Sequence, residues 1–435
     1  MLGLTIGSFA QKRGGEVEEV QYRRSSLDII LVESGKYPYK DTVIKAYNEA
    51  PFPDKYNEHI VGERSFDPKK YPVSNVERIA AGIKETNNKK DTLGSERAKD
   101  MPIIIKKHFE AEKTANKLVA KWFHRSEDGA FDMSLIGERG FYDASAMQAS
   151  LAESSVRGVA SLADAGEELI SKTFVVVNDL TFLSNELVAL AAREVAYRLA
   201  DEISSYPLQV AAKKAADIAY EKAKEGYTVV TNSYLYQLVW NDSVAAVFYN
   251  DLWMDSTSID PDKKIAFDTT SLFQLEFVGS EKASSAVLFS SKKASTTDQI
   301  IALATVRNVD NVYAKLQKTY DVFKTKTPLY TIDPLTAKIG MKEGLEGGEK
   351  FQVLEQVWDE KAQRTTYNSK GIITVDKKNI WDNRYNITDG PGEGEVADAT
   401  EETDKDDKNK DDEITATNFK GNGKYYTGML IRQMK

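Results

Sequence analysis

The sequence predicts an α+β protein, in which a central mixed α/β, sandwich-like domain with a helical hairpin is followed by a small β-barrel. Residues 173–182 (TFVVVNDLTF) place three β-branched apolar residues in a row, which is typical of a strand covered on both faces. Residues 297–324 carry one continuous apolar stripe at helical spacing. After residue 327, short strands alternate with glycine turns, as they do in small barrels.

The length of 435 residues allows two or three domains, because single hydrophobic cores stop growing at about 250–300 residues. We expect four segments: a signal-peptide remnant (1–11), an N-terminal looped region with strands and one helix (12–142), the central α+β domain (143–326) and the barrel domain (327–435). An acidic disordered loop (389–413) is expected to interrupt the barrel domain.

The composition excludes several classes of protein. The formal net charge is −9, with acidic and basic residues interleaved. This disfavours a nucleic-acid partner, which needs a concentrated basic face. The chain has no cysteine, so disulfides, thiolate zinc sites, iron–sulfur clusters and cysteine nucleophiles are excluded. We therefore expect no cofactor and a fold stabilised by packing.

The first residues resemble the second half of a secretory signal peptide. Residues 2–9 form a short apolar run, and Ser8-Phe9-Ala10 has the small-x-small form that signal peptidase accepts. The basic segment expected in front is missing, which a true start upstream of Met1 would explain; a frayed apolar N-terminus is the alternative. No later segment approaches the roughly 18 apolar residues of a membrane span. We expect a periplasmic or secreted protein, with outer-membrane association as a further option.

The N-terminal region is predicted to contain strands at residues 17–22 and 27–32 and one long helix, with a proline-rich looped stretch between the strands and the helix. The helix spans residues 101–125, begins with Pro102 at its first position and carries an apolar stripe that must dock on the sheet. Residues 143–159 favour a broken helix or a loop. A short capped helix at residues 164–172 leads into the central strand.

Two long helices are predicted after the central strand, over residues 184–225. The first carries apolar residues at every fourth position, a narrow seam suited to packing on one partner. The seam consists of Leu187, Ala191, Val195, Leu199 and Ile203. Pro207 ends the first helix and Gly226 caps the Ala-rich second one, so the pair is interpreted as an antiparallel hairpin. An oligomerisation or membrane-insertion role is an alternative for this hairpin.

An aromatic segment follows and predicts a β-hairpin, with strands at residues 227–240 and 244–253 and a turn at 241–243. Half of its side chains would face outward, so some of them form a candidate interaction surface, with core packing as the alternative. The candidate surface consists of Tyr234, Tyr236, Trp240, Tyr249 and Trp253. A third strand is predicted at residues 272–278.

The barrel is predicted from four short strands and a last one that follows an acidic tract. The four strands are expected at residues 335–339, 350–358, 364–367 and 371–375. Residues 389–413 are acidic and have almost no apolar residue, so we interpret them as a disordered surface loop. Residues 425–434 return to strand character, and we expect this strand to complete the barrel.

Metal-binding and phosphate-binding signatures are weak. His108 and His124 stand more than four turns apart on the predicted helix, too far to share a metal, and His59 lies in the looped region. Phosphate-loop, nucleophile-elbow and zinc-protease motifs do not occur in the sequence. The acidic tract lacks the fixed glycine and bidentate Glu of an EF-hand, so a solvated loop is favoured over a calcium site.

Carboxylates at strand ends provide a catalytic alternative. Asp179, Asp242, Asp251 and Asp255 stand where general acids and bases often lie, although Asp also ends strands by bonding the local backbone. A hydrolase that uses Asp179 and Asp242 would need both carboxyls in one concave pocket.

Five segments spread over the chain carry a family resemblance. They are RGFYDAS (139–145), TFVVVNDL (173–180), YLYQLVWND (234–242), KTPLY (326–330) and IWDNRY (380–385). Together they resemble a family of uncharacterised secreted proteins from Bacteroidetes. This resemblance implies neither an activity nor catalytic residues.

Two further resemblances concern parts of the chain. Residues 340–355 have the pattern G-x-x-x-G-L-x-x-G-x-x-F-x-V-L-E, and KGIITV follows at 370–375. This region is similar to the SH3-like barrels at the C-terminus of flagellar assembly protein T and of other envelope-assembly proteins, although the acidic insertion departs from that pattern. Residues 173–253 are distantly similar to the curli-secretion-channel family, whose strands and helices form a periplasmic domain.

These observations favour a non-enzymatic cell-envelope protein with a structural or binding role. Its partners would be other envelope proteins or a second copy of itself. A carboxylate-dependent hydrolase and an oligomeric envelope component like the curli secretion channel are the alternatives. No catalytic, cofactor-binding or metal-binding residue is assigned.

Overall fold

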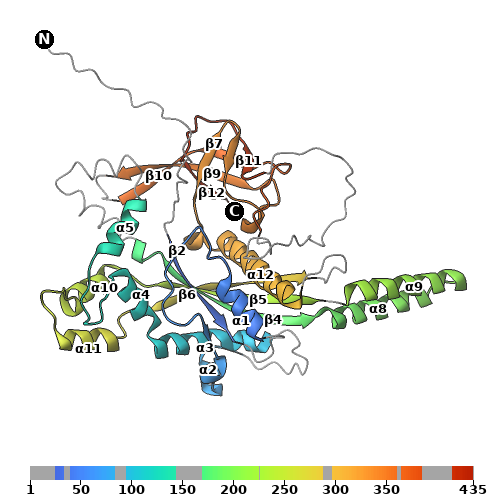
Figure 1. Cartoon of the computed structure of the whole chain (residues 1–435), viewed down its shortest axis with the longest axis horizontal. Helices are drawn as coiled ribbons and strands as arrows, with labels where there is room; N and C mark the ends of the chain where they lie inside the picture. Colours follow the sequence, from blue (N-terminus) through green and yellow to red (C-terminus); the bar gives the residue numbers. More distant parts are fainter. Residues whose placement is uncertain are drawn as a thin grey trace, which may run out of the picture.

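The computed structural model describes residues 25–33, 40–83, 95–143, 169–224, 226–287, 296–359, 364–384 and 414–434. It confirms the α+β class, because a mixed sheet with helices on both faces is followed by a closed six-stranded barrel (Figure 1). Several predicted segments lie outside the described residues: the signal-peptide remnant (1–11), the strand at 17–22, most of the segments at 143–159 and 164–172, and the acidic loop (389–413).

The sheet combines strands from two regions that the sequence analysis kept apart. Its strands are β1 (Ser26–Val32), β2 (Asn57–Glu58), β3 (Ser65–Phe66), β4 (Thr173–Ser184), β5 (Tyr227–Leu238) and β6 (Leu275–Val287). Their order is β2-β1-β4-β5-β6, with β3 also on β1. β1 is parallel to β2, β3 and β4, whereas β5 is antiparallel to β4 and β6. The boundary expected at residue 142 therefore does not divide two separate sheets.

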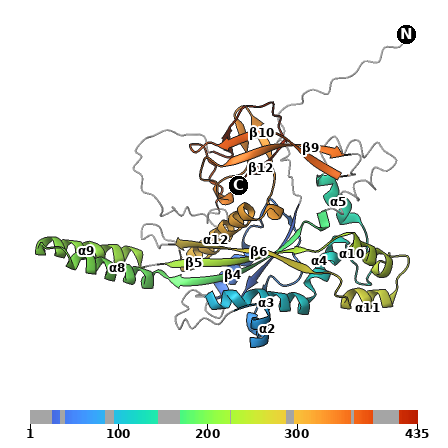
Figure 2. The same ribbon diagram turned by 180° about the vertical axis from the view of Figure 1, so that it is seen from behind.

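Helices cover both faces of this sheet. One face carries α1 (Lys40–Glu49) and α12 (Thr297–Thr319), as Figure 1 shows. The opposite face carries α3 (Ser95–Glu112) and α4 (Thr114–Trp122), seen from behind in Figure 2. Shorter helical elements lie around them: α2 (Asn75–Ala80), α5 (Ser134–Asp143), and the 3₁₀ turns η1 (Pro68–Lys70), η3 (Asp321–Phe323) and η4 (Met341–Glu343).

The three consecutive valines of β4 explain why the sequence of this strand is continuously apolar. Val176 packs in the core that includes Val312 of α12, while Val175 and Val177 pack in the core that includes Trp122 of α4. All three valines are fully buried. The prediction of a strand covered on both faces is confirmed.

The helix predicted at residues 101–125 is in fact two helices, α3 and α4. Lys113 adopts a left-handed backbone (φ 52°) between them, which breaks the helical hydrogen-bond pattern. Pro102 lies inside α3 and not at its first position. A proline cannot donate to the carbonyl four residues earlier. The hydroxyl of Tyr234 donates to that carbonyl, Ala98 O, at 3.2 Å.

The predicted second strand at residues 244–253 is wrong, because this segment is helical. It forms α10 (Asp242–Val247) and the π-helical turn η2 (Phe248–Leu252). The Asn241 side chain accepts hydrogen bonds from the backbone of Ser243 and Val244, so Asn-Asp-Ser begins a helix where a hairpin turn was expected. α11 (Pro261–Thr269) follows, and Asp260 caps it in the same way.

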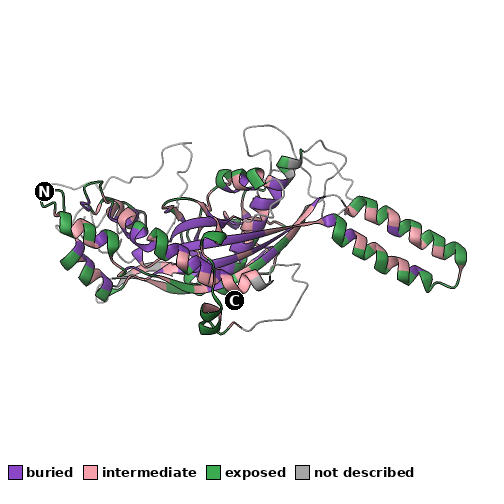
Figure 3. Ribbon diagram, turned by 90° about the horizontal axis from the view of Figure 1, so that it is seen from below, coloured by how far each residue is buried: buried purple, intermediate pink, exposed green. Residues whose placement is uncertain are grey.

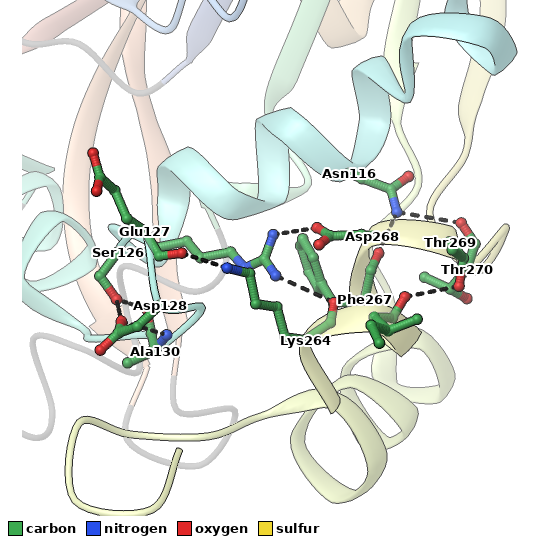
Figure 4. A network of polar contacts seen from close by, with 12 residues as sticks. Asn116, Ser126, Glu127, Asp128, Ala130, Lys264, Phe267, Asp268, Thr269 and Thr270 are labelled. Carbon is green, nitrogen blue, oxygen red and sulfur yellow. Dashed lines mark hydrogen bonds and ion pairs between the residues drawn. The ribbon is translucent and has the colours of Figure 1, made fainter. Parts of the chain in front are cut away.

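A polar network ties α11 to α4 and to the loop that follows it (Figure 4). Arg125 donates to the carboxylate of Asp268, and Asn116 donates to the carbonyl of Phe267 at 2.8 Å. Lys264 donates to the carbonyl of Glu127 at 2.6 Å. The network holds the helical excursion between β5 and β6 against the body of the protein.

The small barrel predicted for the end of the chain is confirmed, although two of its strands, at residues 327–332 and 417–420, were not predicted. Its strands are β7 (Thr327–Ile332), β8 (Leu335–Ala337), β9 (Lys350–Asp359), β10 (Arg364–Val375), β11 (Thr417–Lys420) and β12 (Leu430–Gln433). The closed order is β10-β11-β8-β7-β12-β9, so the last strand completes the barrel between β7 and β9. The two short strands expected at 364–367 and 371–375 form one strand with a register shift between Ser369 and Gly371.

Candidate functional site

The five aromatic residues proposed as a surface pack in the core. Tyr234 and Tyr236 are only 3% and 4% exposed, and Trp240, Tyr249 and Trp253 are partly buried against the same cluster. The ring of Tyr236 meets Phe109 of α3 edge to face at 5.0 Å. The surface hypothesis assumed that solvent covers one side of β5, whereas α3 and α4 cover it. It is therefore corrected to core packing.

The carboxylates of the hydrolase alternative do not converge. Asp179 is buried on β4 and pairs with Arg97 at 2.7 Å. Burial raises the pKa of Asp179 to about 6, and the Arg97 charge opposes this rise. Asp179 pairs with Asn232 of β5, and Asp242 lies beyond the end of that strand. At 3.3 Å per residue, the end of β5 is already roughly 20 Å from Asn232. Asp242, Asp251 and Asp255 are exposed, so these four carboxylates share no pocket.

The histidines serve local structure. The Nε2 of His59 donates to the Leu118 carbonyl at 2.9 Å, and its Nδ1 accepts from Arg139 at 2.9 Å. Burial and the Arg139 charge hold the pKa of His59 well below its usual range, so the ring is neutral. His108 bonds the Tyr71 hydroxyl, and His124 lies beside Asp132. Within the described ranges, no three His, Asp or Glu side chains gather as metal ligands.

A small cavity lies between α1 and α12. Its lining includes Tyr47, Thr305, Tyr313 and Asp310, and burial raises the pKa of Asp310 to about 7. The cavity volume is about 20 Å³, which is room for roughly one water molecule. An organic ligand does not fit there.

Asp28 occupies a gap in the outer edge of the sheet. β2 pairs with Ser26 and Leu27, and β3 pairs with Leu31 and Val32, so no described strand pairs with the middle of β1 on that side. The Asp28 carboxylate accepts hydrogen bonds from the backbone of Ile29 and Val61. The Oδ2 atom of Asp28 has no hydrogen-bond partner among the described residues. Burial raises the pKa of the Asp28 carboxyl to about 7. The charged form is therefore disfavoured in the folded protein.

Replacing Asp28 by Asn is expected to remove part of the pH dependence of stability. A carboxyl with a higher pKa in the folded state than in the unfolded chain stabilises the fold when protonated, so stability is lost as pH rises from about 4 to 7. Relative to Asp28→Asn, the natural protein should lose on the order of 2 kcal/mol between pH 5 and pH 8. Thermal unfolding at both pH values measures this, with the exposed Asp251→Asn as the control. A difference that does not change with pH would contradict the expectation.

The helical hairpin α8 (Asn185–Asp201) and α9 (Tyr206–Ala223) extends away from the rest of the molecule (Figures 1 and 3). It is continuous with the sheet, because β4 runs directly into α8 and β5 follows α9. Ser184 caps α8 by accepting from the backbone of Glu186. At the base, Gly226 has a positive φ of 104°, a backbone that glycine adopts without strain, and turns the chain into β5.

The two helices contact each other through small and charged residues. Ala189, Ala200 and Ala216 are the buried residues of this seam. The guanidinium of Arg193 lies 4.4 Å from the centre of the Tyr220 ring, and Lys213 pairs with Asp201 at 2.6 Å. The row predicted as a seam suited to packing on one partner does not lie between the two helices, because its side chains are exposed. Leu187, Val195, Leu199 and Ile203 of that row are 70%, 54%, 60% and 36% exposed.

One face of the hairpin is aliphatic. On α8, the positions one residue before the buried seam are Val188, Ala192, Val195 and Leu199, and on α9 they include Leu208, Ala215 and Ala219. One residue corresponds to a rotation of about 100°. Because α8 and α9 are antiparallel and face each other, a step of one residue back from the seam turns the side chains of both helices to the same side of the hairpin. The four larger side chains, Val188, Val195, Leu199 and Leu208, are 57%, 54%, 60% and 61% exposed. We call these seven residues the aliphatic face.

Comparison with models of known protein families finds no match, and neither does comparison with curated proteins. None of the described helices combines the length and the apolar character needed to cross a bilayer. The exposed apolar side chains of the aliphatic face make it the candidate functional site.

Proposed function

We propose that this chain is a non-enzymatic interaction protein of the cell envelope, periplasmic or secreted, whose α8–α9 hairpin is its binding element. The exposed aliphatic face is the observation that carries this proposal. Large exposed apolar patches in folded proteins mark interaction sites, because burying them on a partner is favourable at about 25 cal/mol per Å².

The hairpin does not need its aliphatic face in order to fold. Its two helices already close on the seam that contains Ala189, Ala200 and Ala216, with Tyr197 donating to Asp217 at 2.7 Å. The residues of the aliphatic face make no part of that contact. We therefore explain the apolar character of the aliphatic face by contact with a binding partner.

The envelope location rests on the sequence. The apolar run at residues 2–9 and the small residues at Ser8 and Ala10 support export. The resemblance to secreted Bacteroidetes proteins and to barrels of envelope-assembly proteins points the same way. An oligomeric component like the curli secretion channel is the second candidate, and the projecting hairpin favours it.

Site-specific photo-crosslinking in the native host tests this function. A photo-reactive residue in place of Leu199 should give crosslinked products in the envelope fraction. The same residue in place of Glu194, which is exposed on the other side of α8, should give few. Recovery of the native protein in the cytoplasmic fraction, or equal crosslinking from both positions, would contradict the proposal.

A further inference from the structure

We infer that α12 closes the long outer edge of the sheet to strand addition, and that this contact holds back a binding edge built into the fold. Lys315 of α12 and Tyr320, which caps its C-terminus, occupy backbone carbonyls of β6 that an added strand would use. The inference goes beyond the proposed function and does not depend on the hairpin. It rests on the position of β6, on the direction of its backbone groups and on their contacts with α12.

β6 is the long open edge of the sheet. It is the last strand in the order β2-β1-β4-β5-β6, and no described strand pairs with its outer side. β6 has 13 residues, whereas β2 and β3 at the opposite edge have 2 residues each. An edge strand presents backbone N–H and C=O groups to which a strand of another chain can bind, and short edge strands reduce this hazard. β6 is therefore the edge at which strand addition has to be controlled.

The register of β5 and β6 shows which backbone groups point outward. Successive residues along an inner strand bond to opposite neighbours. The backbone N–H of Val239, directly after β5, donates to the Gln274 carbonyl on the side of β6 at 2.9 Å. Every second residue back along β5 therefore bonds toward β6, and this set includes Ser233, the partner of Glu281. The even-numbered residues around Glu281 then turn their N–H and C=O groups outward. These outward residues are Ser280, Lys282 and Ser284.

Two of the outward carbonyls are occupied by side chains from α12. The Tyr320 hydroxyl donates to the carbonyl of Ser280 at 3.0 Å, and the Lys315 Nζ donates to the carbonyl of Lys282 at 2.8 Å. An added strand would need the same two carbonyls as acceptors for its own N–H groups. It can pair with this part of β6 only after both side chains have moved away.

The backbone of β6 is shaped to receive the Tyr320 ring. Its register on β5 shifts between Leu235 and Tyr236, and Gly279 is the first residue paired after this bulge. A Cβ atom at Gly279 would overlap the Tyr320 ring, so glycine is needed for the ring to lie against the edge. Bulges and lysines on an edge strand also discourage pairing, and Lys282 is exposed. Bulge, charge and covered carbonyls thus act in the same direction.

Removing the two donors tests the inference. A full chain with Lys315→Ala and Tyr320→Phe keeps the aromatic ring on Gly279 but loses both hydrogen bonds to the edge. In sedimentation velocity, it should associate more strongly with rising concentration than the natural chain does. Adding Lys282→Thr should strengthen the association further, because a charge is removed from the edge. Each single variant should fall between the natural chain and the double variant.

Hydrogen exchange locates the association on β6. In the associated double variant, the backbone amides of Ser280, Lys282 and Ser284 should exchange about tenfold more slowly than in its monomer, because pairing protects them. Lys318→Ala is the matched control, since Lys318 is also on α12 but donates to the carbonyl of Gly344, at 2.8 Å. It should associate no more than the natural chain. Circular dichroism should be the same for all these chains.

Three results would overturn the inference. The first is a variant with all three changes that associates no more than the natural chain. The second is a natural chain whose outward β6 amides already become protected as concentration rises, since its edge would then be open. The third is association of the double variant without added protection on β6, because another surface would then be responsible.

Discussion

Replacing Phe248 by Ala is expected to lower the free energy of unfolding by about 3–5 kcal/mol. Phe248 is fully buried at the start of η2, in the middle of an aromatic cluster. Its ring centre lies 4.6 Å from that of Phe123, 5.2 Å from Phe131 and 5.7 Å from Trp240. Truncation removes contacts with all of them. The surrounding rings belong to different elements and cannot close the cavity together.

Urea unfolding measures this loss. The neighbouring Val247 is 40% exposed, so Val247→Ala should change stability by no more than about 0.5 kcal/mol. Phe248→Leu should fall between the two, since it keeps part of the apolar volume. Equal effects of Phe248→Ala and Val247→Ala would show that the aromatic cluster is not packed as described.

Replacing Arg139 by Ala is expected to cost about 2–4 kcal/mol, because buried acceptors lose their donor. Arg139 is 7% exposed and donates to Ser26 Oγ at 2.7 Å and to His59 Nδ1 at 2.9 Å. Its guanidinium also lies 4.4 Å from the centre of the Trp122 ring. Removing the side chain breaks these contacts between α5, α4 and the edge of the sheet.

The stability lost in Arg139→Ala should also depend on pH, and His59 determines whether the loss is larger at low or at high pH. Its pKa is lowered in the folded protein, so stability is lost as pH falls below about 6.5. Arg139 contributes to that lowering, so in Arg139→Ala the loss at low pH is smaller. The difference between the natural protein and the variant should therefore be smaller at pH 5 than at pH 8. Exposed Arg198→Ala is the control, and a pH-independent difference would contradict this role of Arg139.

The elements with dense burial patterns could be predicted from the sequence. β4 is marked by three valines that pack on two opposite cores, and α12 by an apolar stripe that meets the sheet. The closing strand β12 could be anticipated because apolar β-character returns after the acidic tract. In each case the side chains that define the pattern are the ones that are buried, so local pattern and tertiary structure agree.

The segment at residues 242–252 could not be predicted, because its residue types suit either a strand or a helix. Phe248 and Leu252 are four residues apart, a spacing that places them on one face of a strand and equally on one face of a helix. The Asn241 cap and the rings around Phe248 decide for the helix. These rings include Phe123 at the end of α4 and Phe267 of α11, which are distant in the sequence.

The hairpin could be named from its sequence as an oligomerisation or membrane-insertion element, but the row that closes it could not be identified. The sequence of α8 offers two rows, one of larger aliphatic residues and one of alanines, and only the larger row was predicted as a seam, suited to packing on one partner. The alanine row closes the hairpin because small side chains and the Lys213–Asp201 pair allow close contact. The sequence did contain a sign of the candidate site: α8 carries two apolar rows, whereas a helix that packs only on α9 needs one.

The continuity of the hairpin with the sheet also has a mechanical consequence. β4 runs out to the hairpin and β5 returns from it, so a pull on the tip loads both strands along their own length. Their hydrogen bonds to β1 and β6 are then placed in shear, where many rungs resist at once. A tensile force applied through the hairpin would thus meet the sheet in the direction in which it yields least.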